Sequence, residues 1–102
     1  MIHVIADIQI VDGRQNDFLA EFHKIVPAVR AEKGCVEYIP LTDVETDIGA
    51  QSPLRTNAVT VVEKWESIDA LKAHLAADHM AAYREAVKDM VSGVKLQILE
   101  PA

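Results

Sequence analysis

Residues 58–91, AVTVVEKWESIDALKAHLAADHMAAYREAVKDMV, decide the fold because the spacing of their apolar side chains changes partway along. Residues 58–65 alternate between two sets of side chains, which is typical of a strand with two different faces. Ser67 is a natural helix cap, and apolar residues after it recur every three or four positions. The stretch therefore predicts a strand followed by a pair of helices.

The second helix of this pair has predicted signals at both ends. Asp78 is a suitable cap, and Gly93 is expected to end the helix. Between them, the apolar positions are spaced at three and four: Met80, Tyr83, Val87, Met90 and Val91. Residues 94–99 alternate again and predict a last strand.

The N-terminal part of the chain shows the same two periods. Residues 2–11 and 35–41 alternate and predict strands, and residues from about 15 to 33 carry the apolar stripe of a half-buried helix. Pro27 is expected to kink that helix. The polar residues 42–57 are too many for a tight hairpin, so we expect either a mobile flap or an irregular sheet edge there.

The order of predicted elements, βαββαβ, is typical of a ferredoxin-like α+β fold in a single domain over residues 1–102. Such a fold places its helices on one face of a four-stranded antiparallel sheet. The even-numbered side of the first strand is wholly apolar: Ile2, Val4, Ala6, Ile8 and Ile10. If that side is the uncovered one, a second subunit is needed to bury it, which predicts a homodimer. Alternatively, the apolar side packs against the helices and the mixed side faces water. The alternation of side chains does not decide between these two arrangements.

Composition excludes several classes of function. The chain has 102 residues with 10 Lys and Arg against 16 Asp and Glu, a net charge of −6, so binding to nucleic acid or an anionic membrane is not expected. Cys35 is the single cysteine, which rules out an internal disulfide and favours the cytoplasm. No apolar run approaches the ~20 residues of a membrane span, and the N-terminal residues do not resemble a signal peptide.

The chain carries no glycine-rich phosphate loop, no nucleophile elbow and no CxxC, so nucleotide cofactors and hydrolase triads have no support. The candidate site residues on the strands are His3, Asp7, Glu63 and Trp65, and those in the helix pair are His74, His79 and Tyr83. Packing alone would also account for Trp65 and Tyr83. His74 and His79 would lie ~140° apart on one helix and could converge only if a break intervened at Asp78, so no metal site is expected.

Several motifs resemble the antibiotic biosynthesis monooxygenase family, in particular its small bacterial quinol monooxygenase branch. They include EKWES at 63–67, ALKAHL at 70–75, HMAAY at 79–83 and EKGC at 32–35. The N-terminal strand and residues 22–27, FHKIVP, add to the resemblance, which covers about residues 2–101.

The resemblance implies a dimeric α+β barrel with a pocket between sheet and helices in each subunit. It implies that the apolar side of the first strand lines the barrel and that the four strand candidates face the pocket. Such proteins oxidise quinols or related phenols with O₂ and without metal, flavin or nicotinamide. His74 is then expected to be the base, with Asp7 or Glu63 orienting it or acting instead. Trp65 is expected to stack on the substrate, and Tyr83 and His79 to contact a phenolic oxygen.

Two other functions stay open. An isomerase or lyase of a small metabolite could use the two helix-pair histidines as acid and base, and a non-catalytic dimer could bind an aromatic or haem-like ligand. Asp7 stands where haem-degrading relatives carry Asn, which disfavours haem. Val61 stands where anthrone-oxidising relatives carry an Asn, so oxygen activation by that amide is absent here.

Overall fold

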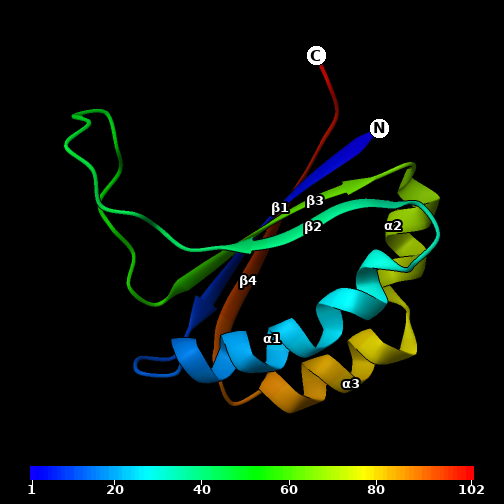
Figure 1. The fold of residues 1–102 in the computed structure, drawn as a ribbon, viewed down its shortest axis with the longest axis horizontal. Coiled ribbons are helices and arrows are strands. Elements are labelled where there is room, and N and C mark those ends of the chain that lie inside the picture. The colour runs from blue at the N-terminus through cyan, green and yellow to red at the C-terminus, as the bar shows by residue number, and fades with distance from the viewer.

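A computed structural model describes all residues 1–102 and has the predicted ferredoxin-like architecture. The elements follow the order β1 (Ile2–Ile10), α1 (Gln15–Arg30), β2 (Cys35–Leu41), β3 (Ala58–Trp65), α2 (Ile68–Leu75), α3 (Asp78–Val87) and β4 (Val91–Leu99). Figure 1 shows one sheet with the helices to one side of it. None of the helices combines the length and the apolar character that crossing a membrane requires.

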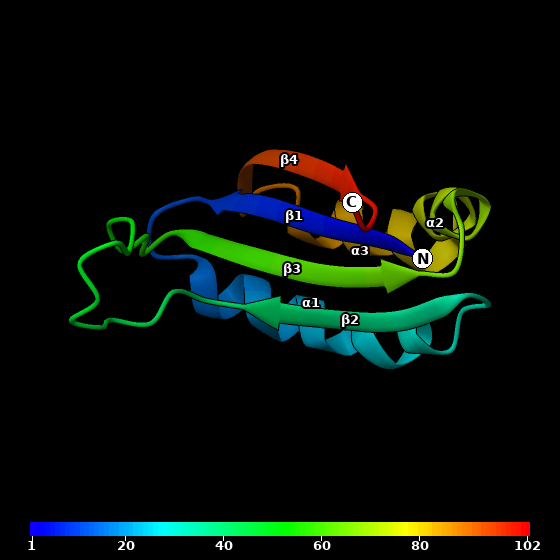
Figure 2. The same cartoon turned by 90° about the horizontal axis from the view of Figure 1, so that it is seen from above.

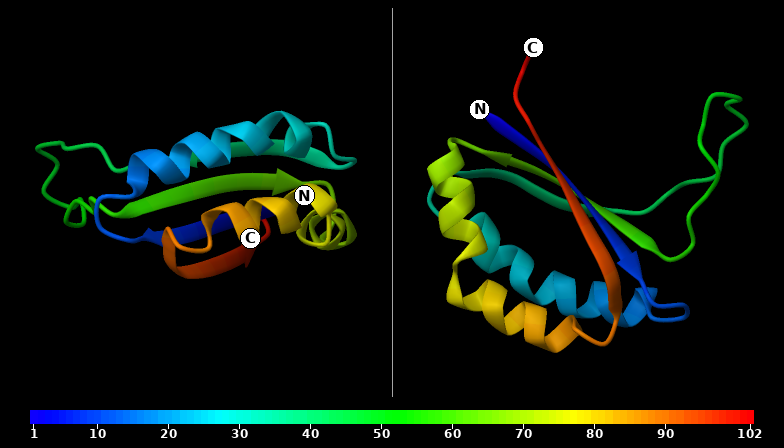
Figure 3. Two further views of the ribbon diagram at one scale, coloured as in Figure 1. Left: turned by 90° about the horizontal axis from the view of Figure 1, so that it is seen from below. Right: turned by 180° about the vertical axis from the view of Figure 1, so that it is seen from behind.

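The four strands form an antiparallel sheet in the order β2-β3-β1-β4. The views from above and below show that all three helices lie on the same side of this sheet (Figures 2 and 3). The register between the central strands pairs Ile2 with Trp65 and Val4 with Glu63. Directly paired residues share a sheet face, so the apolar side of β1 and the side of β3 that carries Glu63 and Trp65 are one surface.

That shared surface is the one that the helices cover. Val4, Ala6 and Ile8 of β1 are all buried, as are Phe18 and Phe22 of α1. The expectation that the apolar side of β1 is left for a second subunit is therefore wrong, and the alternative, in which it meets the helices, is confirmed. Burial of apolar surface explains this choice, because the amphipathic α1 must cover an apolar face.

The turn after α1 depends on Gly34. Its φ of +84° is in the left-handed region, and a Cβ atom there would lie 2.7 Å from the Cβ of Ala70. A side chain at this position would be strained and would clash with α2. The turn therefore brings the end of α1 close to α2, which matters for the site.

Local signals of the C-terminal half are confirmed in part. The Ser67 hydroxyl accepts from the Ala70 amide at 3.1 Å and caps α2. Asp78 is not the cap, because it is the first residue of the helix and Ala77 holds the N-cap position. Gly93 does not end α3, which stops at Val87; instead it lies within β4, opposite Gln9.

The connection over residues 42–57 contains no helix or strand. Figure 1 shows it, in green, extending away from the sheet. Arg55 ties it to the sheet, since its guanidinium lies 2.8 Å from Asp7 and 2.8 Å from Asp43. The segment is therefore irregular and is tethered to the sheet near its end by Arg55.

Candidate functional site

A cavity of about 290 Å³ lies between the sheet and the helices. Ten of its thirteen lining residues are hydrophobic, and its ionisable side chains are Tyr38, Glu63, His74, Tyr83 and Arg84. Hollows of about 410 and 400 Å³ lie along the 42–57 connection, but they hold no buried ionisable group. An apolar hollow with a few convergent polar groups is the usual form of a small-molecule site.

Glu63 is a buried carboxyl without a cation beside it. The residue is 5% exposed, and its Oε1 accepts a hydrogen bond of 2.9 Å from the Trp65 indole nitrogen. Burial raises the pKa of Glu63 to about 7, although the bond from Trp65 opposes the rise. Glu63 can therefore exchange a proton near neutral pH, as an acid or base in catalysis must.

His74 of α2 is 1% exposed, and its ring contacts two aromatic rings. Its centroid is 4.6 Å from that of Trp65 and 5.4 Å from that of Tyr38. Burial lowers the pKa of His74, and nearby Glu32 partly offsets this effect. The neutral imidazole is thus favoured at neutral pH.

One nitrogen of His74 is held and the other is free. The Nδ1 atom lies 2.9 Å from Oε2 of Glu32, and because an ionised carboxylate only accepts, Nδ1 carries the hydrogen. Nε2 makes no hydrogen bond within the chain. Every fully buried side-chain nitrogen or oxygen of the protein has a hydrogen-bond partner. Because Nε2 has none, it cannot be fully buried and must be partly accessible. Since the ring lines the cavity, this lone pair is available to a bound molecule.

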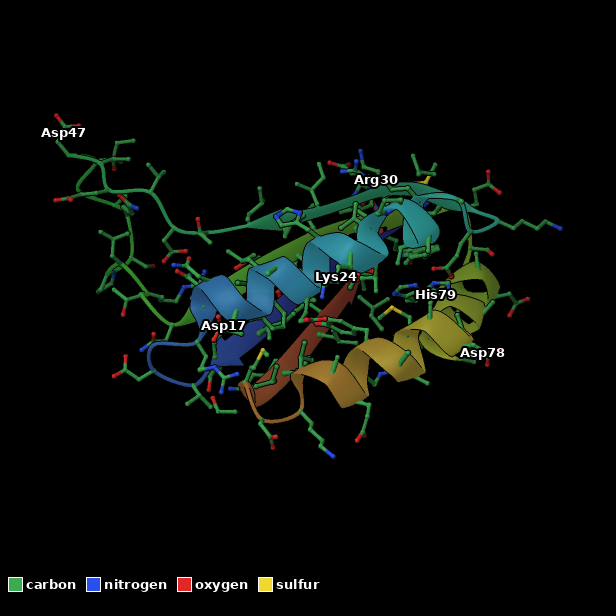
Figure 4. All side chains as sticks on the ribbon, turned by 60° about the horizontal axis from the view of Figure 1, so that its bottom comes forward. Asp17, Lys24, Arg30, Asp47, Asp78 and His79 are labelled. Carbon is green, nitrogen blue, oxygen red and sulfur yellow. The ribbon has the colours of Figure 1, made fainter.

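Glu32 is one of two cavity-region residues, with Tyr38, that the sequence reasoning missed. It follows α1 just before Gly34 and binds both helix-pair histidines, because His79 Nε2 also lies 2.9 Å from its Oε2. Figure 4 shows His79 at the start of α3, facing the end of α1. No periodic pattern singled out Glu32; the turn at Gly34 was the available signal that it comes back against α2.

Glu32, His74 and His79 are also the residues that could hold a metal ion, because their donor atoms lie within 4.8 Å of one another. The expectation that no metal site forms depended on the five-residue spacing of the histidines. That reason fails, because α2 ends at Leu75 and α3 begins at Asp78. The change of helix direction between them lets the two rings converge.

Tyr38 and Tyr83 complete the polar part of the cavity. Burial raises the pKa of both phenols, so both stay protonated and can donate. Neither hydroxyl makes a hydrogen bond within the chain. Since no fully buried polar side-chain atom lacks a partner, both hydroxyls must be partly accessible. Phe22 stacks on Tyr38 with ring centroids 5.4 Å apart and fixes its orientation. Tyr38 was predicted only as one residue of a strand face.

The structure brings some predicted site residues together and separates others. Glu63, His74 and Tyr83 line the cavity. Trp65 does not line it: the ring is 0% exposed behind His74 and Glu63, so the expected stacking on a ligand is not possible in this arrangement. His79 does not line the cavity either, and its Nε2 contacts Glu32 instead.

His3 and Asp7 lie on the other face of the sheet, so the expectation that they face the pocket is wrong. The register pairs His3 with Lys64 and Asp7 with Thr60, both on the side of β3 away from the helices. Asp7 instead binds Arg55 at 2.8 Å. The alternation within each strand was identified correctly, but the phase between two strands is a property of their pairing.

Comparison with known proteins gives consistent results. A sequence model of the family described as "Antibiotic biosynthesis monooxygenase" matches residues 1–86. The "Probable quinol monooxygenase YgiN" of Escherichia coli (strain K12) is 41% identical over 103 aligned positions, which cover 99% of this chain and 98% of that protein.

Solved structures of lower identity share the fold. PA3566 from Pseudomonas aeruginosa is 22% identical with a TM-score of 0.82, covering 99% of this chain and 93% of that one. Rv0793 from Mycobacterium tuberculosis is 22% identical with a TM-score of 0.80, covering 99% of this chain and 94% of that one. These two similarities show the ferredoxin-like arrangement alone.

Proposed function

The chain belongs to the antibiotic biosynthesis monooxygenase family, and we propose that it oxidises a quinol or a related phenol with O₂ inside the cavity of the helix-covered face. Family membership and the relative described as a quinol monooxygenase support an oxidoreductase. The observation that carries the proposal is the free Nε2 of His74 beside an apolar hollow, with Nδ1 held by Glu32 at 2.9 Å.

The reaction balances without an added reductant. A quinol and O₂ give a hydroxylated quinone and water: one oxygen atom enters the ring, and the other leaves as water with electrons that the quinol supplies. The protein's task is to make the quinol electron-rich by removing a proton and to stabilise the resulting anion.

The side chains divide this task. Nε2 of neutral His74 accepts the proton of one phenolic hydroxyl, and Glu32 holds the ring as it becomes charged. The protonated hydroxyls of Tyr38 and Tyr83 donate to the oxygen on which negative charge develops. Glu63 in its neutral form donates to the second substrate oxygen. The apolar walls exclude water and strengthen each of these interactions.

Oxygen uptake with menadiol, corrected for autoxidation, tests the proposal. His74→Ala should lower kcat/KM by about 10²-fold or more, because it removes the base. His3→Ala is the matched control on the other sheet face and should leave the rate unchanged. Equal rates in His74→Ala and wild type would contradict the proposal. Turnover that persists without oxygen would favour an isomerase or lyase, and tight binding without turnover would favour a binding protein.

A second copy of the chain is the partner that fits the open face of the sheet. Ile39, Val62 and Ile5 lie in one row across three strands on that face, because Val62 pairs with both isoleucines. We propose a homodimer in which two such faces pack together, as sheets with apolar rows do. The single free thiol of Cys35 supports a reducing, cytoplasmic location.

A further inference from the structure

We propose that Glu32, His74 and His79 form a binding site for a divalent transition-metal ion, with Zn²⁺ as the best fit. The three donors come from separate segments: the turn after α1, α2 and the first turn of α3. Two imidazole nitrogens and one carboxylate oxygen are a usual set of protein ligands for zinc, with water in the fourth position. Ca²⁺ and Mg²⁺, which prefer oxygen ligands, fit less well.

The distances need little change to accommodate the ion. Oε2 of Glu32 is 2.9 Å from each histidine nitrogen, and all donor atoms lie within 4.8 Å. Ligand atoms that share a tetrahedral zinc ion at about 2.0–2.2 Å are about 3.3–3.6 Å apart. Small rotations of the two imidazoles would therefore place the three atoms around one centre.

Charge and access also favour a cation. Glu32 is the only acidic residue of the cluster, and no lysine or arginine forms an ion pair with it. The side chain of His79 is 32% exposed, that of Glu32 14%, and that of His74 2%. The cluster thus opens to solvent at His79 and ends at the cavity wall, so an ion can enter from outside without crossing the cavity.

Metal binding would change what His74 offers to the cavity. An imidazole that binds a metal through Nδ1 carries its hydrogen on Nε2. Nε2 would then donate a hydrogen bond instead of accepting a proton. Zinc bound to Nδ1 of His74 should therefore inhibit quinol oxidation, because Nε2 can no longer accept a proton. This consequence, unlike the site itself, rests on the proposed function.

Calorimetric titration of metal-stripped protein with ZnCl₂, and the absorption spectrum of its Co²⁺ form, test the site without reference to activity. Wild type should bind one ion per chain. Glu32→Gln and His79→Gln should each weaken binding at least tenfold, whereas His3→Gln and His23→Gln, which alter the other two histidines, should not. Cys35→Ser should also bind normally, which excludes a thiolate site.

The outcomes separate the site from the proposed function. No binding by wild type, or equal binding by Glu32→Gln and His79→Gln, would overturn the metal site and leave the oxidation mechanism intact. Binding with loss of menadiol turnover, relieved in His79→Gln, would support both the site and its consequence. Binding with unchanged turnover would retain the site and contradict the role of His74 as the base.

Discussion

The two faces of the sheet place similar carboxyl groups in opposite environments. Glu63 and Asp7 are carboxylates on neighbouring central strands. On the helix-covered face, Glu63 is 5% exposed, has only the Trp65 indole as a partner, and has its pKa raised to about 7. On the open face, Asp7 is 41% exposed at its side chain and is paired with Arg55.

The difference indicates that a carboxyl of this sheet can take part in acid–base chemistry when it is buried without a counter-ion. A carboxylate paired with a cation in water is a structural tether, and its residue type says little about catalysis. A carboxyl kept in an apolar wall can hold or release a proton near neutrality. Four substitutions can break or sharpen the contrast between the two faces.

Trp65→Ala should have the largest effect on stability. The ring is completely buried beneath the cavity, contacts His74 and donates to Glu63. Its removal should lower the free energy of unfolding by about 3–5 kcal/mol, measured by urea denaturation. Val44→Ala in the connection, at a residue 70% exposed, is the control and should change it by less than about 0.5 kcal/mol. Similar losses in both variants would remove the distinction.

Glu63→Gln should have the next largest effect, and its sign depends on pH. The pKa of Glu63 rises from 4.5 to about 7 on folding, so the folded chain binds more protons between these values. Wild-type stability should therefore fall as the pH rises from 4.5 to about 7. Glutamine avoids this cost, so the variant should be more stable by up to about 3 kcal/mol at pH 8 and nearly unchanged at pH 4.

Asp7→Asn is the matched change on the open face. It removes one exposed ion pair with Arg55, so the free energy of unfolding should change by less than about 1 kcal/mol at both pH values. Thermal unfolding across the pH range checks both variants. A pH-independent effect of Glu63→Gln would mean that its carboxyl is not buried as described. Above pH 7, ionised Glu63 can no longer donate a hydrogen bond to the substrate, so menadiol turnover by wild type should fall. Glutamine cannot ionise and still donates, so the Glu63→Gln variant should retain its turnover there.

Val62→Lys should have the smallest effect on the subunit fold and act mainly on assembly. Val62 lies between Ile5 and Ile39 in the apolar row of the open face, and a lysine there would place a charge in the proposed dimer interface. Sedimentation equilibrium should show a dimer for wild type and a monomer for the variant, with similar circular dichroism spectra. A monomeric wild type would refute the proposed homodimer and leave the open face to solvent.

Much of the fold was predictable because it depends on local periods. The strands at 35–41 and 58–65 have the predicted bounds, and Ser67 caps α2 as expected. The first helix ends at Arg30, three residues earlier than predicted, and continues through Pro27. The errors in element bounds concern helix ends. Gly93, for example, was expected to end the last helix, but more than one residue near a helix end can carry the same termination signal.

The site was predictable only in part. His74 and Glu63, which the family resemblance implied to be parts of one pocket, both line the cavity. Glu32 and Tyr38 were missed because their importance comes from contacts 42 residues and 36 residues along the chain, with His74 in both cases.

By itself, the sequence determined the order of elements, the two-faced character of each strand, and an acidic chain with a single cysteine, since these depend on neighbours within a few residues. Only the tertiary structure decided which strand faces coincide, which face the helices cover, and that Glu32 holds both His74 and His79. The physical reason is that strand register and helix packing minimise exposed apolar area over the whole chain.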